Sequence, residues 1–295
     1  MHDGISSMEW ALFLEDIEKY RGKKVENYHY IVDTYDKDLT KKKNFKNEEF
    51  TYLYFGCEFC EYKIPRTGQM KDFFQICKEE RLFPVFVTPV ATDYGISKIQ
   101  EYLDVLMDEN DMSIVVNDYG VLELLYNAGA IGRIIAGRVL DKLSHESRAS
   151  IQELYQYYGR DGLEYATTPG ILSDSHKAAL KKYDINRYEF DVPKVGLQLK
   201  EVGLHYSLYW PLSYITTGRV CPFRAMDRRG VDKFLVGSPC TVRCKNVMIE
   251  RRSLTGDMEN HKYVLQEGNT IFYINDNDVI GNFSHWFDRI ILQVL

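Results

Sequence analysis

From residue 50 onward, short apolar runs alternate with longer segments whose apolar residues recur at helical spacing. The strand candidates are 50–55, 84–90, 113–116, 130–136, 185–190 and 205–210. The helix candidates between them are 70–81, 96–109, 120–126, 148–158, 175–183 and 194–202. Strands that alternate with helices form βα units with a parallel sheet. This run of units favours an α/β fold, a TIM-like β/α barrel, which is irregular because residues 163–172 fit neither pattern.

The chain before residue 50 follows a different pattern. An apolar stretch at 10–17 and a strand candidate at 28–32 precede a polar stretch at 36–49, which contains Lys41, Lys42 and Lys43. We interpret residues 36–49 as a solvated insertion, because they offer no apolar face that a helix or strand could bury.

The pattern of apolar and polar residues changes again after Cys244. Segments 247–251, 262–266 and 270–274 look like β strands joined by tight turns, and 287–294 is apolar enough to close the barrel. We therefore expect one domain over residues 1–295. Within it, 219–245 form a cysteine-bearing loop and 246–295 form a small β extension with the closing strand.

Composition and charge indicate a globular protein without a nucleic-acid surface. The chain has 295 residues, of which 45% are hydrophobic and 27% charged, and its net charge is −6. Its lysines and arginines are spread along the sequence, which disfavours a basic binding face. The start lacks the features of a secretory signal, and no apolar run approaches the roughly 20 residues that span a bilayer. We expect a cytoplasmic protein.

Six cysteines in a reducing compartment are more typical of metal binding or burial than of disulfides. Cys57 and Cys60 follow the predicted strand 50–55, and Cys221, Cys240 and Cys244 follow the last predicted strand. The βα loops of a barrel emerge at the carboxyl ends of its strands. The fold would therefore bring thiols from distant parts of the sequence together.

Four thiolates can hold either a four-iron cluster or a structural zinc ion. Zinc would use the short pairs Cys57/Cys60 and Cys240/Cys244, whereas the 18 residues between Cys221 and Cys240 favour a cluster held by loops on a rigid barrel. Basic residues of the loop would offset the negative charge on either centre; they are Arg219, Arg224, Arg228, Arg229, Arg243 and Lys245. Cys77 lies on a predicted helix and is interpreted as a buried apolar residue. Cluster, zinc and unliganded cysteines all stay open on the residues alone.

Four polar residues near predicted strand ends are candidate catalytic residues. Asn117 and Asp118 follow the strand 113–116, where they would contact a substrate or cap a helix. Arg138, just after 130–136, would bind a carboxylate or phosphate, or form a salt bridge. Glu189 is either a site acid or base, or the partner of an ion pair inside the barrel, where Arg187 shares its side of the strand.

The seven histidines show no metal-ligand spacing, and His145 lies among polar residues. We therefore predict that His145 and most other histidines lie at the surface. Neither a Gly-x-Ser-x-Gly nucleophile motif nor a His-Glu-x-x-His zinc motif occurs. The sequence thus gives no support to hydrolysis.

Several segments, in this order, resemble peptidase family U32. They are YLYFG at 52–56 followed by Cys60, VVNDYGVL at 115–122, AGRVL at 136–140, and the stretch from PLS at 211–213 to RVC at 219–221. The likeness is greatest to the short members of the family that act in oxygen-independent ubiquinone biosynthesis.

The resemblance implies an iron–sulfur cluster, [4Fe-4S], held by Cys60, Cys221, Cys240 and Cys244, with Cys57 as a spare. It also implies a component of an oxygen-independent hydroxylation, working beside a second member of the family as a hetero-oligomer. Other relatives modify RNA bases, so the substrate is a small molecule or RNA. A zinc-stabilised scaffold without catalysis and a peptidase are the alternatives.

Overall fold

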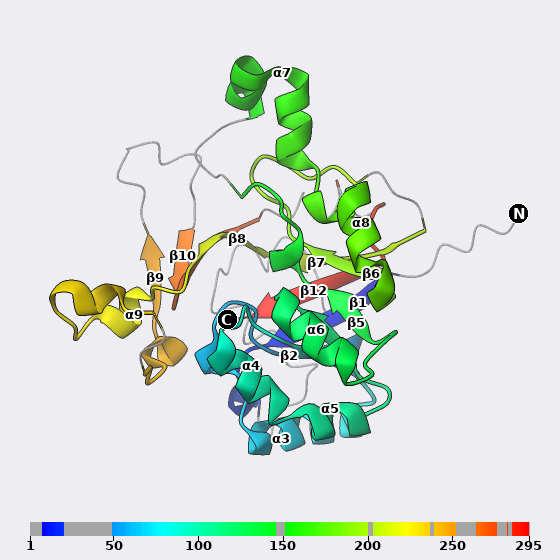
Figure 1. The fold of residues 1–295 in the computed structure, drawn as a ribbon, viewed down its shortest axis with the longest axis vertical. Coiled ribbons are helices and arrows are strands. Elements are labelled where there is room, and N and C mark those ends of the chain that lie inside the picture. Colours follow the sequence, from blue (N-terminus) through cyan, green and yellow to red (C-terminus); the bar gives the residue numbers. More distant parts are fainter. Residues whose placement is uncertain are drawn as a thin grey trace, which may run out of the picture.

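Eight parallel strands form a closed barrel (Figure 1), which confirms the predicted α/β TIM-like fold. The structure is a computed structural model that describes residues 8–20, 49–145, 151–199, 203–236, 239–251, 264–275, 282 and 285–294. The barrel strands are β1 (Glu9–Leu14), β2 (Phe50–Gly56), β3 (Phe83–Val87), β4 (Ser113–Val116), β5 (Ile134–Ala136), β6 (Arg187–Phe190), β7 (His205–Trp210) and β12 (Arg289–Val294). They neighbour one another in the order β1-β12-β7-β6-β5-β4-β3-β2.

The barrel closes between the two ends of the described chain, because β12 pairs in parallel with both β1 and β7. The predicted closing strand 287–294 is therefore confirmed, and the apolar stretch at 10–17 contains β1. The strand candidate 28–32 and residues 36–48 of the predicted insertion lie outside the described residues.

Helices cover the outside of the barrel, with α3, α4, α5 and α6 along one side and α7 projecting from another (Figure 1). The α-helices are α3 (Thr67–Glu80), α4 (Asp93–Gln100), α5 (Leu103–Asp108), α6 (Tyr119–Asn127), α7 (Ile151–Thr167), α8 (Asp174–Leu180) and α9 (Pro222–Ala225). The 3-10 helices are η1 (Ile17–Tyr20), η4 (Glu61–Lys63), η5 (Arg138–Leu140), η6 (Gly170–Leu172), η7 (Lys181–Tyr183), η8 (Gly230–Phe234) and η9 (Arg243–Asn246). No helix within the described ranges combines the length and the apolar character that crossing a bilayer requires.

Two helix predictions need correction. The predicted helix 194–202 is wrong over its described part, since residues 194–199 form a turn and irregular backbone. Val195, Leu197 and Leu199 are buried there at every second position, which is not a helical spacing, and each side chain packs from irregular backbone. The predicted helix 96–109 is two helices, α4 and α5, which meet near Glu101.

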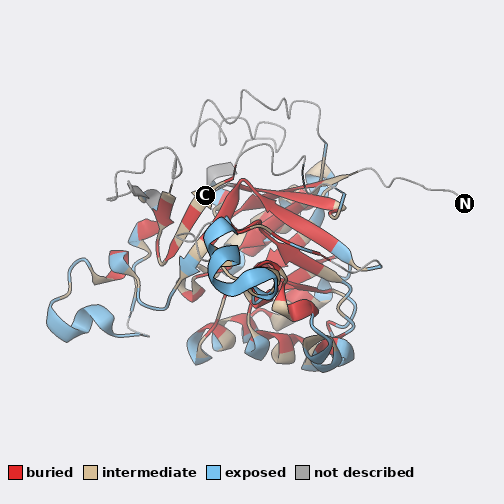
Figure 2. Cartoon of the chain, turned by 90° about the horizontal axis from the view of Figure 1, so that it is seen from above, coloured by how far each residue is buried: buried red, intermediate tan, exposed pale blue. Residues whose placement is uncertain are grey.

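The core has an inner and an outer layer, because successive side chains of a strand point to opposite faces of the sheet. In β1, Ala11 and Phe13 belong to the cluster inside the barrel, whereas Leu12 and Leu14 belong to the larger cluster outside it. Figure 2 shows the strands buried at the centre and the helices exposed on their outer faces. Burial on both faces explains why these strands read as continuous apolar runs.

A second, antiparallel sheet stands beside the barrel (Figure 1). Its strands are β8 (Leu212–Thr217), β9 (Met248–Arg251), β10 (Val264–Glu267) and β11 (Thr270–Ile274), in the order β8-β11-β10-β9. The last three match the predicted β extension, whereas β8, which directly continues β7, was not predicted. This sheet carries the late cysteine loop next to the barrel.

Gly56 ends β2 in a conformation that other residues rarely adopt, with φ at 136°. A Cβ atom there would lie 2.1 Å from the backbone oxygen of Val87. We expect Gly56→Ala to lower the free energy of unfolding by about 2 kcal/mol, because positive φ strains alanine and the strand must shift. Chemical denaturation measures this cost. Gly68→Ala is the control, since its Cβ meets no atom within 4 Å and should be neutral or slightly stabilising.

Candidate functional site

Four cysteines from distant parts of the sequence line one pocket, which has a volume of about 240 Å³. Cys60 lies in the loop after β2, Cys221 directly precedes α9, Cys240 follows on the same loop and Cys244 lies in η9. All six cysteines of the chain are free thiols. The pocket therefore contains the predicted ligand set of one early and three late cysteines.

The two remaining cysteines lie elsewhere. Cys57 is 2% exposed and, among the described residues, is not one of those that line the pocket. Cys77 lies on α3 in the outer apolar core, as predicted for a buried apolar residue. The geometry thus associates Cys60, and not Cys57, with the late cysteines.

The thiols that line the pocket do not form a compact group in the described part of the chain. Thiolates that bind one zinc ion at about 2.3 Å in a tetrahedron lie roughly 3.8 Å from one another. Within the described chain, no three of the cysteine sulfur atoms come within 4.8 Å of one another. A single tetrahedral ion would therefore require these thiols to move closer together.

Asn269 ties the early and late cysteine loops together. Its amide nitrogen donates hydrogen bonds to the backbone oxygens of Phe59 and Gly218, both at 2.7 Å. Next to it, Gly268 has φ at 56°, and a Cβ there would lie 3.3 Å from the Cys244 sulfur. The β10–β11 turn therefore fixes the spacing of the thiols.

Burial raises the pKa of the Cys60 thiol to about 12 and that of Cys244 to about 11, and Cys240 adds to both shifts. Lys63 acts in the opposite direction on both thiols. These thiols are protonated at neutral pH unless a cation compensates, and metal binding would release their protons. Arg219 and Arg224 also line the pocket and supply positive charge.

Arg138 lies inside the mouth of the barrel and is fully buried. Its guanidinium donates to Glu58 from Nε at 2.9 Å and from Nη2 at 2.6 Å, and to Asp191 from Nη1 at 3.1 Å. The backbone oxygen of Leu212 and the side chain of Gln293 accept the remaining bonds. With its five N–H groups engaged, Arg138 organises the site and does not bind a substrate anion.

Glu189 lies deeper in the barrel and accepts hydrogen bonds from the hydroxyls of Tyr54 and Tyr209, both at 2.8 Å. Burial raises the pKa of this carboxyl. The expected pairing with Arg187 is wrong, because Arg187 donates to Asp288 at 2.6 Å and to Ser207 at 3.0 Å. Glu189 is thus held by two phenols.

Asn117 and Asp118 have positioning roles. The Asn117 amide donates to the backbone oxygen of Thr88 at 2.9 Å and accepts from the Val139 N–H at 3.2 Å. Asp118 is the N-cap of α6, where its carboxylate accepts from the Gly120 N–H at 2.7 Å. Of the two alternatives, the structure supports loop fixing and helix capping.

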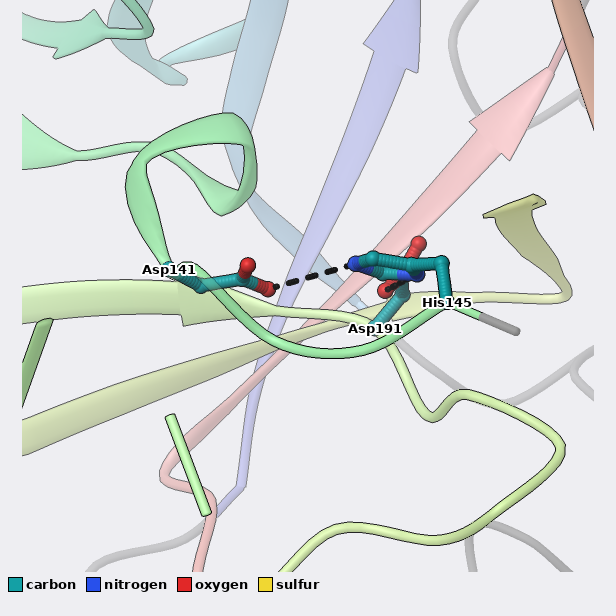
Figure 3. Close-up of side chains that lie close together, drawn as sticks. All are labelled: Asp141, His145 and Asp191. Atoms are coloured by element: carbon teal, nitrogen blue, oxygen red, sulfur yellow. Dashed lines mark ion pairs between the residues drawn. The ribbon is translucent and has the colours of Figure 1, made fainter. Parts of the chain in front are cut away.

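Asp141, His145 and Asp191 form a second group at the same end of the barrel (Figure 3). The prediction that His145 lies at the surface is wrong, since its side chain is 7% exposed and packs against Tyr214 with ring centroids 3.8 Å apart. Nothing local to His145 signals this burial. Asp191 and Glu58, by contrast, follow β6 and β2 closely, which is a position that could have marked them as site residues.

Comparison of the chain with models of protein families, with curated proteins and with solved structures found no match. The resemblance to peptidase family U32 therefore stays a prediction from the sequence. The geometry of the cysteine pocket is the observation that bears most directly on function.

Proposed function

We propose that this protein binds one [4Fe-4S] cluster through Cys60, Cys221, Cys240 and Cys244. The observation that carries the proposal is that these four thiols line one pocket although the first is separated from the others by most of the barrel sequence. Four cysteines are the usual ligands of such a cluster. The carboxyl ends of the barrel strands are also where this architecture builds its sites.

The residues around the pocket fit a cluster. Phe59, Val90 and Val236 line it with apolar surface, which limits the access of water. Four thiolates leave a net negative charge, and Arg219 and Arg224 lie against the pocket to offset it. Both charge and shape therefore suit an anionic, redox-active group better than a hydrated cation.

We propose further that the protein is a component of an oxygen-independent hydroxylation, as in relatives of family U32. A bound cluster would supply one-electron transfer. The residues that line the pocket would hold the cluster in place, limit the access of water and balance its charge. With a net charge of −6, the protein suits a small-molecule substrate better than RNA.

A partner chain, a second member of the same family, is part of this proposal. The loop around the late cysteines exposes apolar side chains, namely Val220, Met226, Val231, Phe234, Leu235 and Val236. Apolar side chains gathered on one exposed loop are typical of a surface that another protein covers. Such a partner would reach the cluster directly.

Anaerobic purification followed by iron, sulfide and zinc analysis tests the proposal. We expect about four iron and four sulfide ions per chain, the content of one cubane cluster. Zinc without sulfide would contradict the proposal and support the zinc-stabilised scaffold. Because clusters are lost in air, protein from aerobic preparations must first be reconstituted anaerobically with iron and sulfide.

A further inference from the structure

Asp141, His145 and Asp191 direct ligand atoms toward one another near the ends of β5 and β6 (Figure 3). One ligand atom from each side chain lies within 4.8 Å of the other two. Asp141 is 1% exposed and Asp191 is 0% exposed. None of the three lines the cysteine pocket, so this group is separate from the proposed cluster site.

Each carboxylate is anchored by hydrogen bonds through one oxygen and faces His145 with the other. Asp141 Oδ1 accepts from the Leu143 N–H at 2.8 Å, and Asp191 Oδ2 accepts from Arg138 at 3.1 Å and from the Tyr214 N–H at 2.8 Å. Asp141 Oδ2 and Asp191 Oδ1 are buried without a hydrogen-bond partner, and so are both ring nitrogens of His145. Buried polar atoms without hydrogen bonds are costly, and these four face one another at ion-pair distance.

The distances fit ligands around an ion better than hydrogen bonds. His145 Nε2 lies 3.7 Å from Asp141 Oδ2, and His145 Nδ1 lies 3.7 Å from Asp191 Oδ1. Both separations exceed the usual length of a hydrogen bond. Ligands at about 2.1 Å from one ion are roughly 3.0 to 3.4 Å apart, so the three side chains must move closer together to share an ion.

The local charge also favours a cation. The buried carboxylates of Glu58 and Asp191 share the guanidinium of Arg138, and that of Asp141 faces His145. With all three carboxylates ionised and the imidazole neutral, the group would carry an excess of two negative charges in a buried region, which is unfavourable without compensation. A divalent ion would neutralise the excess.

We propose that Asp141, His145 and Asp191 bind one divalent metal ion of the first transition row at the mouth of the barrel. Two carboxylates and one imidazole suit ions such as Mn²⁺ or Fe²⁺. Three protein ligands leave positions open for water or a substrate oxygen.

Titration of the full chain with Mn²⁺ tests the proposal. Binding is measured as the loss of the free-ion signal in electron paramagnetic resonance. Mn²⁺ is the probe because it prefers oxygen and nitrogen ligands to thiolates. We expect one ion per chain, and at least about tenfold weaker binding in Asp141→Asn, Asp191→Asn and His145→Gln. Asp288→Asn is the matched control, since Asp288 precedes β12 at the opposite end of the barrel, and it should bind Mn²⁺ as the original chain does.

Two results would overturn the proposal: no saturable binding of Mn²⁺, or unchanged affinity in the folded Asp141→Asn and His145→Gln variants. Circular dichroism identifies any variant that does not fold. If Asp141→Asn does not fold, the Mn²⁺ affinity of His145→Gln decides between the outcomes. A His145 ring that is doubly protonated at neutral pH by ¹⁵N NMR, without Mn²⁺ binding, would identify an imidazolium between two carboxylates instead. The same titration of the Cys60→Ser variant should be unchanged, so failure of the cluster proposal leaves this test intact.

Discussion

Replacement of Cys60, Cys221, Cys240 or Cys244 by alanine is expected to reduce the iron and sulfide content from about four ions of each per chain to near zero. Each of these residues supplies one of four thiols to the pocket. Three thiolates leave one iron open to solvent, and the cluster is then readily lost. Metal and sulfide analysis after anaerobic reconstitution measures the effect for each variant.

Cys57→Ala and Cys77→Ala are the controls, and both should retain the cluster. They remove thiols that, among the described residues, do not line the pocket. A cluster that survives Cys60→Ala but not Cys57→Ala would show that the early ligand is Cys57. Retention of iron and sulfide in all four pocket variants would exclude the pocket as the cluster site.

Substitution of Arg138 by methionine should lower the free energy of unfolding by about 3 to 5 kcal/mol. The side chain has nearly the same length but no charge, so the carboxylates of Glu58 and Asp191 lose their buried cation. Uncompensated buried charge is among the most destabilising changes that a single residue can cause. Urea denaturation of the protein without metals measures the cost.

Arg160→Met is the control for the loss of an arginine, because Arg160 is exposed on α7 and the change in the free energy of unfolding should stay within about 0.5 kcal/mol.

Burial raises the pKa of Glu58 to about 7. Arg138 lowers this pKa, so in the variant the pKa of Glu58 should be higher still, and lowering the pH from 8 to 5 should protonate Glu58 and reduce the cost of losing Arg138. A cost below about 1 kcal/mol at pH 8 would contradict the ion-pair role of Arg138.

The sequence predicted the barrel because its signals are local. Strands buried on both faces read as short apolar runs, and the six predicted strands each overlap a barrel strand. The helix prediction at 194–202 was misleading, because the apolar side chains at 194–199 are buried from irregular backbone. Periodicity reports which side chains are buried, and only indirectly which backbone conformation buries them.

The cysteines could be grouped in advance because barrel topology sends every βα loop to the same end. The partners of the charged side chains inside the barrel could not be predicted from the sequence. Arg138 meets Glu58, which is 80 residues away in the sequence, and Gln293, which is 155 residues away. Those pairings exist only once the barrel has closed, and the number of possible pairings in a chain of 295 residues is far too large for the sequence pattern to select one.

By itself, the sequence determined the alternation of strands and helices, the closing strand and the loops that carry the thiols, since each depends on neighbouring residues. Only the tertiary structure decided that Arg138 is saturated by its partners, that Glu189 is held by two tyrosines and that His145 is buried between Asp141 and Asp191. The physical reason is that charge compensation and desolvation depend on distances in space, which closure of the barrel sets.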